Sequence, residues 1–135
     1  MSAGISAPIA EAITEIRASF SAHRVDVEPD GQGGAFVRVH DLGIGHAFTP
    51  NTSSVGFQIT FQYPFADIYP HYLRPDLARA DGGALTPPLH KGQSFVTPAG
   101  TTPAVMLSRR SNHRDPETDT AAVKLAKVLD WLRSQ

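Results

Sequence analysis

The sequence contains no cysteine. This absence excludes disulfide bonds, thiolate metal sites and a thiol nucleophile, so any covalent chemistry has to use another kind of side chain. A length of 135 residues suits a single domain spanning residues 1–135. A domain of this size buries enough surface to fold without covalent cross-links.

Long apolar runs and an excess of one charge are also missing. No stretch approaches the run of about 18 apolar residues that a membrane-spanning helix needs. The 12 basic and 13 acidic residues leave a formal net charge of -1, so we expect neither nucleic acid nor a membrane surface as a partner. The first residues carry no basic segment ahead of an apolar run, which argues against a secretory signal and for a cytoplasmic location.

The sequence predicts an amphipathic helix near each end. Over residues 6–20 the apolar side chains recur every three or four positions, at Ile5, Ile9, Ile13, Ile16 and Phe20. For the second helix, Asp115 is the expected N-cap and Pro116 the first helical residue. Its expected buried stripe is Ala121, Leu125, Val128, Leu129 and Leu132. Lys124 and Lys127 are expected to face water.

Between the helices the sequence predicts an antiparallel four-stranded meander. The strands are expected at residues 25–27, 35–40, 55–62 and, least clearly, 72–73. In the third, Val55, Phe57, Ile59 and Phe61 alternate with polar residues or glycine, so a period of two puts all four on the core side. Residues 75–114 are rich in proline and glycine and predict a long irregular loop with a short extended piece at 104–107. The fold class is therefore α+β.

The third strand runs into Tyr63-Pro64-Phe65, and this combination resembles the ubiquitin-conjugating-enzyme (UBC-like) family in a divergent bacterial form. The resemblance implies a ubiquitin-like protein and an activating enzyme as partners, the latter docking on the N-terminal helix. It also places Met106 where the family has its nucleophilic cysteine. The chain departs from the family pattern in having a single Pro70 instead of a proline pair after the turn, and Ile68 where the related RWD modules have proline.

Without a thiol, the acyl group would be carried as an oxyester on a hydroxyl, and a hydroxyl needs a base within hydrogen-bond reach. Ser108 is the leading candidate for the nucleophile, followed by Ser111 and then the pair Thr101–Thr102. His90 or His113 is the candidate base. All of these residues lie in the segment from about His90 to His113, which is expected to form the active region before the last helix.

Three further residues, in the run from Ser108 to His113, are candidates for stabilising negative charge. Arg109 and Arg110 carry positive charge beside the proposed nucleophile, and Asn112 is an amide donor for an oxyanion. The alternative is a catalytically inactive UBC-like module that binds a ubiquitin-like protein or an activating enzyme without carrying the acyl group. A plain solvated loop is the third possibility for this run. We favour the oxyester hypothesis over the inactive module by a narrow margin.

No cofactor or metal is expected. The six histidines show no pair at the i, i+4 spacing of a helical zinc site, and His40 and His46 lie six residues apart across two glycines. Gly43-Ile44-Gly45 lacks the third glycine and the following helix of a dinucleotide-binding fingerprint.

Overall fold

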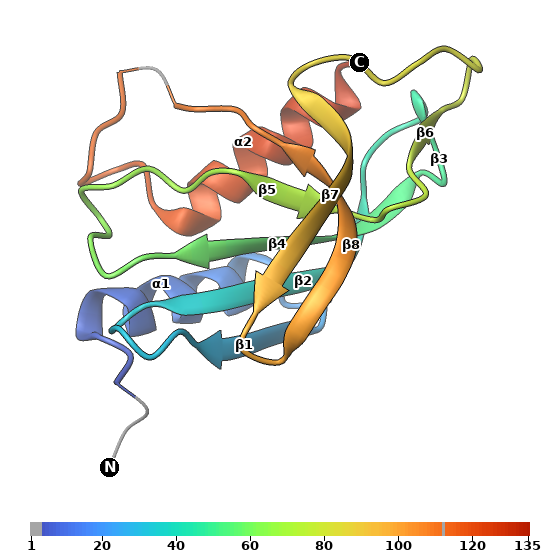
Figure 1. Ribbon diagram of the computed structural model, residues 1–135. Helices are drawn as coiled ribbons and strands as arrows, with labels where there is room; N and C mark the ends of the chain where they lie inside the picture. Colours follow the sequence, from blue (N-terminus) through green and yellow to red (C-terminus); the bar gives the residue numbers. More distant parts are fainter. Residues whose placement is uncertain (1–3, 112) are drawn as a thin grey trace.

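The computed structural model describes residues 4–111 and 113–135, in which a helix at each end brackets a set of β-strands (Figure 1). The helices are α1 (Ala7–Ser19) and α2 (Ala121–Arg133). The strands are β1 (Val25–Pro29), β2 (Ala35–Gly43), β3 (Phe48–Thr49), β4 (Thr52–Ile59), β5 (His71–Leu73), β6 (Ala78–Arg79), β7 (Leu89–Thr97) and β8 (Gly100–Leu107). The predicted α+β class is confirmed.

The main sheet has six strands in the order β1-β2-β4-β5-β8-β7, and every neighbouring pair is antiparallel. Its first four strands follow one another along the chain, apart from the short β3, which pairs with β6 in a separate two-stranded sheet. The predicted meander is therefore present, and it is extended by a hairpin, β7–β8, that the sequence did not predict.

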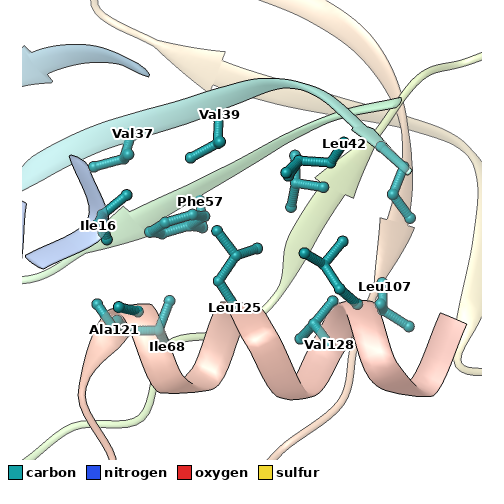
Figure 2. Packing of buried hydrophobic residues seen from close by; sticks show 14 of the residues in the cluster. Ile16, Val37, Val39, Leu42, Phe57, Ile68, Leu107, Ala121, Leu125 and Val128 are labelled. Carbon is teal, nitrogen blue, oxygen red and sulfur yellow. The ribbon is translucent and has the colours of Figure 1, made fainter. Parts of the chain in front are cut away.

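Both helices pack on one face of this sheet and enclose the hydrophobic core (Figure 1). The alternation in β2 and β4 decides which side chains enter it, since Val37 pairs with Phe57 and Val39 with Val55 on the same face. Figure 2 shows Phe57 lying between these strands and Leu125 of α2. The buried side chains of β2 and β4 therefore pack against the apolar side of α2 in one core.

The β7–β8 hairpin crosses the opposite face of the sheet (Figure 1). Phe95 of β7 holds it there, because its ring stacks on Tyr72 at 4.8 Å and meets Phe36 edge-on at 6.0 Å. Gly56 lies directly beneath this ring, where a Cβ would come within 2.6 Å of Phe95 Cε2. Glycine at this position lets the hairpin lie close against the sheet.

The prediction of an irregular loop over residues 75–114 is wrong for residues 89–107, which form the hairpin. Only the short extended piece at 104–107 was expected, and it is the end of β8. Four consecutive residues of β7 before Phe95 are exposed, so that strand has no alternation that a sequence reading could detect. Most of the predicted active region is therefore β-strand.

Two further predictions are corrected at the ends of elements. Phe61 is 60% exposed instead of buried, because β4 ends at Ile59 and the chain turns before Phe61 is reached. Helix α2 begins at Ala121, and its N-cap is Thr120, whose side chain accepts a hydrogen bond from Val123 N at 3.3 Å. Asp115 begins a turn instead, in which its carbonyl accepts from the N–H groups of the residues three and four positions later.

The predicted stripe of α2 is confirmed, since all five of its apolar residues are buried. Lys124 was expected to face water but is only 7% exposed, whereas the Lys127 side chain is 62% exposed as predicted. In the part of the chain that the structure describes, no helix is both long and apolar enough to cross a membrane.

Candidate functional site

The predicted site residues lie mainly on a strap, residues 108–111, that connects the end of β8 to the loop before α2. Ser108 N donates a hydrogen bond to Pro88 O at 3.0 Å, which fixes the first residue of the strap beside the start of β7. The strap is therefore positioned by the hairpin at one end and, as described below, by α2 and the Tyr-Pro-Phe turn at the other.

Ser108 and His90 meet at the base of the hairpin. Leu89 pairs with Leu107 and His90 with Met106 across the two strands, so the imidazole of His90 reaches the residue that follows β8. The distance between His90 Nε2 and Ser108 Oγ is 3.1 Å, and both residues are half-buried. In the tautomer with the proton on Nδ1, the Ser108 hydroxyl donates to Nε2.

This pair has the geometry of a nucleophile and its general base. Among residues 4–111 and 113–135, no hydrogen bond is formed to Nδ1 of His90, so the imidazole lacks the third group that orients it in a serine–histidine–aspartate triad. The arrangement is a dyad, and its imidazole is held by the backbone pairing of β7 with β8.

Ser111, at the other end of the strap, is enclosed by Asp67 and Lys124. Its backbone N–H donates to Asp67 Oδ2 at 2.7 Å and its hydroxyl to Asp67 Oδ1 at 3.0 Å. Lys124 Nζ lies 2.8 Å from Ser111 Oγ, 2.8 Å from Arg109 O and 3.3 Å from Asp67 Oδ2. All three N–H groups of the ammonium therefore have acceptors.

The electrostatics of this cluster keep Asp67 and Lys124 charged and paired. Burial alone would raise the pKa of Asp67, but the hydrogen bonds from Ser111 and the positive charge of Lys124 lower it overall. Burial lowers the pKa of Lys124, and the Asp67 carboxylate opposes that shift. Because the Ser111 hydroxyl donates to a carboxylate and accepts from an ammonium, it has no free base and is a poor nucleophile.

The two strap arginines stack on aromatic rings. The guanidinium of Arg109 lies 5.0 Å from the ring centre of Trp131 in α2, and that of Arg110 lies 4.6 Å from the ring centre of Tyr69. Both arginines are exposed. Stacking occupies the faces of the guanidinium groups and leaves their N–H edges able to bind an anion.

The remaining predicted site residues are not brought to Ser108. His113 is exposed and, in the described part of the chain, makes no hydrogen bond to Ser108. Thr101 and Thr102 lie at the opposite end of β8, and Asn112 lies outside the described residues. Met106, at the position where the resemblance expects cysteine, lies within β8 and pairs with Tyr72.

Sequence reasoning missed Asp67 and the role of Lys124. A signal for Lys124 existed, because position 124 lies on the same side of α2 as the buried residues at 121, 125 and 128. Asp67 carried no comparable signal, since its role depends on the strap returning to the Tyr-Pro-Phe turn from 44 residues further along the chain.

A hollow of about 520 Å³ lies on the face of the sheet opposite the helices. It is lined by residues of β1, β2, β7 and β8 and of the hairpin turn. It contains none of the predicted site residues except Thr101 and Thr102. Within the residues that the structure describes, no three histidine, aspartate or glutamate side chains are grouped so that they could hold a metal ion.

The chain matches no protein-family model, no curated protein and no solved structure.

Proposed function

We propose that this chain is a UBC-like acyl carrier of a bacterial ubiquitin-like conjugation pathway, acting in the cytoplasm, with Ser108 as the nucleophile. The observation that carries the proposal is the 3.1 Å contact between Ser108 Oγ and His90 Nε2. Of the hydroxyls considered from the sequence, Ser108 alone has an imidazole as its hydrogen-bond partner, whereas Ser111 is held between Asp67 and Lys124.

The architecture supports the same proposal. Tyr63-Pro64-Phe65 lies in the connection between β4 and β5 of the meander, and the Tyr63 hydroxyl accepts a hydrogen bond from Ala121 N at 3.2 Å. The turn that motivates the resemblance therefore fixes the start of the last helix. The exposed side of α1 is the proposed docking face for the activating enzyme, in line with the resemblance.

In each step of the proposed chemistry, His90 takes one proton from the nucleophile and gives one to the leaving group. His90 Nε2 takes the proton of the Ser108 hydroxyl as Oγ attacks the C-terminal carbonyl carbon of the ubiquitin-like protein held on the activating enzyme. The bond to the activating enzyme breaks, and its leaving group takes the proton from the imidazolium. An acceptor amine then attacks the oxyester and gives a proton to His90, and Ser108 Oγ leaves and takes that proton from the imidazolium. Arg109 and Arg110, which follow Ser108 in the strap, are the proposed source of positive charge for the oxyanion.

The proposal is tested by incubating the chain with the activating enzyme, the ubiquitin-like protein and ATP. A covalent adduct is expected that resists thiol reductant and is released by strong base. Ser108→Ala should abolish it, and His90→Gln should slow its formation by about 100-fold or more, as expected for loss of a general base. Ser94→Ala, at an exposed serine of β7, is the matched control and should charge normally. Undiminished charging of Ser108→Ala would refute the assignment.

The second candidate function is a non-catalytic module that binds the ubiquitin-like protein or the activating enzyme. Phe61 and Phe65 favour it because these large apolar side chains, on either side of Tyr63 in the sequence, are 60% and 81% exposed. Binding of the ubiquitin-like protein without any adduct, lost in Phe65→Ser and retained in Ser108→Ala, would favour this candidate.

A further inference from the structure

A small pocket between the strap and α2 is lined mainly by positive charge. Its volume is about 120 Å³, and its lining residues are Arg109, Arg110, Ser111, Lys124, Lys127 and Val128. Four of these six side chains are cationic. A liquid water molecule occupies about 30 Å³, so the pocket has room for a small polyatomic anion but not for a nucleotide.

Only two of the four cations have a carboxylate partner. Lys124 pairs with Asp67 at 3.3 Å, and Lys127 pairs with Asp119 at 2.9 Å. Arg109 and Arg110 contact no carboxylate within residues 4–111 and 113–135. The pocket therefore has an excess of two positive charges, which an anion with two negative charges would balance.

The two arginines are also held in place before any ligand arrives. Each guanidinium is stacked on a ring, Arg109 on Trp131 and Arg110 on Tyr69, so less side-chain freedom is lost when an anion binds. Their free N–H edges offer the forked donor geometry that matches the oxygens of phosphate. The backbone carbonyl of Arg109 is bound by Lys124 Nζ, which holds the strap against the helix.

Lys124 positions the strap and is not itself a ligand of the anion. Its three donors are already used by Asp67, Ser111 and the Arg109 carbonyl, and the Asp67 carboxylate balances its charge. The excess positive charge of the pocket therefore comes from Arg109 and Arg110. Lys127 is exposed and can turn from Asp119 towards the ligand.

From these observations we infer that the pocket between the strap and α2 is a binding site for a phosphate dianion, with Arg109 and Arg110 as its principal ligands. Arg109 and Arg110 are common to this inference and to the proposed acyl transfer, but phosphate binding requires neither the Ser108 nucleophile nor the His90 base. The sequence predicted only that Arg109 and Arg110 stabilise negative charge during acyl transfer. The inferred site gives the same two residues a ligand of their own.

The test is a titration of the ¹⁵N-labelled chain with sodium phosphate at constant ionic strength, followed by amide chemical shifts. Saturable shifts at residues 109–111 and in the first two turns of α2 are expected. The double variant Arg109→Gln/Arg110→Gln should weaken phosphate binding at least tenfold. Arg24→Gln is the matched control, since Arg24 is an exposed arginine already paired with Asp26 at 3.0 Å, and it should bind as the original chain does.

Two further titrations define the ligand. Acetate, with a single charge, should bind at least tenfold more weakly than phosphate, and equal binding would overturn the inference of a dianion site. O-phosphoserine should shift the same amides as inorganic phosphate, and tighter binding of phosphoserine would identify a phosphorylated side chain as the source. Phosphate binding that survives in the double variant, or is absent from the original chain, would overturn the site. Ser108→Ala should bind phosphate normally, which separates this result from the fate of the acyl-carrier proposal.

Discussion

His71 is a buried polar residue for which the described structure provides no hydrogen-bond partner. It is 1% exposed, both ring nitrogens lack a partner, and its ring lies 5.2 Å from that of Phe57. The pKa of His71 is lowered from 6.5 to about 3, chiefly by burial and also by the positive charge of Lys124, while the Asp67 carboxylate acts in the opposite direction. Because this site disfavours the charged imidazole, the free energy of unfolding depends on pH.

The direction of this dependence follows from the two states. Below pH 6.5 the unfolded chain binds a proton at His71, whereas the folded chain does not until the pH approaches 3. The contribution of His71 to the free energy of unfolding is therefore fully present above pH 6.5. It is lost as the pH falls below that value, at a limiting slope of about 1.4 kcal/mol per pH unit. Between pH 7 and pH 5 the loss from this residue alone is about 2 kcal/mol.

The perturbation is His71→Leu, which replaces the ring with an apolar side chain of similar size. At pH 7 the variant should be more stable by about 1–3 kcal/mol, because a buried group without hydrogen-bond partners has been removed. From pH 7 to pH 5 this advantage should grow by about a further 2 kcal/mol, since the variant has no proton to bind at this position. This range lies above the titration of the carboxylates, so their contribution largely cancels in the comparison.

The assay is urea denaturation of both proteins at several pH values between 7 and 5, analysed by linear extrapolation. The difference in unfolding free energy is plotted against pH. A difference that stays constant over this range would refute the reasoning, because it would mean that His71 in the folded chain takes up its proton as readily as in the unfolded chain. A His40→Leu variant serves as control, since His40 is half-buried and bonded to Asp26 at 2.8 Å, and it should not reproduce the growing advantage.

Three further predictions concern packing, the Asp67 cluster and the last helix. Gly56→Ala should destabilise the fold by about 1–3 kcal/mol in a thermal melt, because its Cβ would overlap the Phe95 ring, and Phe95→Leu should restore part of the loss. Ser111→Ala should lower the free energy of unfolding by about 1–3 kcal/mol, since Lys124 loses an acceptor in a buried cluster, yet it should leave acyl loading intact. Thr120→Ala should cost about 1 kcal/mol of stability by urea denaturation, because it removes the N-cap of α2.

The variants at Gly56 and Thr120 each have a control at a position that lacks the same contact. Gly43→Ala introduces a Cβ with nothing within 4 Å and should change stability little, so an equal loss there would contradict the packing argument. Asp115→Ala should cost less than Thr120→Ala, because Asp115 does not cap the helix. Loss of acyl loading in Ser111→Ala at a temperature where the variant is folded would contradict the structural role assigned to Ser111.

The meander and the final helix stripe could be predicted because their burial follows a local period. Val55, Phe57 and Ile59 enter the core together since alternate side chains of a strand share one face. The hairpin could not be predicted, because β7 is buried only at Leu89 and Phe95 and its position depends on Gly56 and Tyr72 in distant strands.

For the candidate site, the sequence identified the residue types but not how they pair. Ser108 and His90 were both candidates, and their meeting depends on the β7–β8 register, which no local pattern encodes. Ser111 ranked directly behind Ser108 in the sequence, and what excludes it as a nucleophile is its contact with Asp67, on a turn, and Lys124, on a helix face. Local capping signals likewise placed the start of α2 too early.

The central claim is that the Ser108 hydroxyl carries the acyl group with His90 as its base, and the substitution Ser108→Cys tests it most directly. The change keeps the nucleophile in place and converts the expected oxyester into a thioester. We expect thiol reductant to release the adduct of the variant but not that of the original chain. Peptide mapping of the original adduct should locate it on Ser108. An adduct of Ser108→Cys that still resists reductant, or one mapped to another residue, would contradict the account.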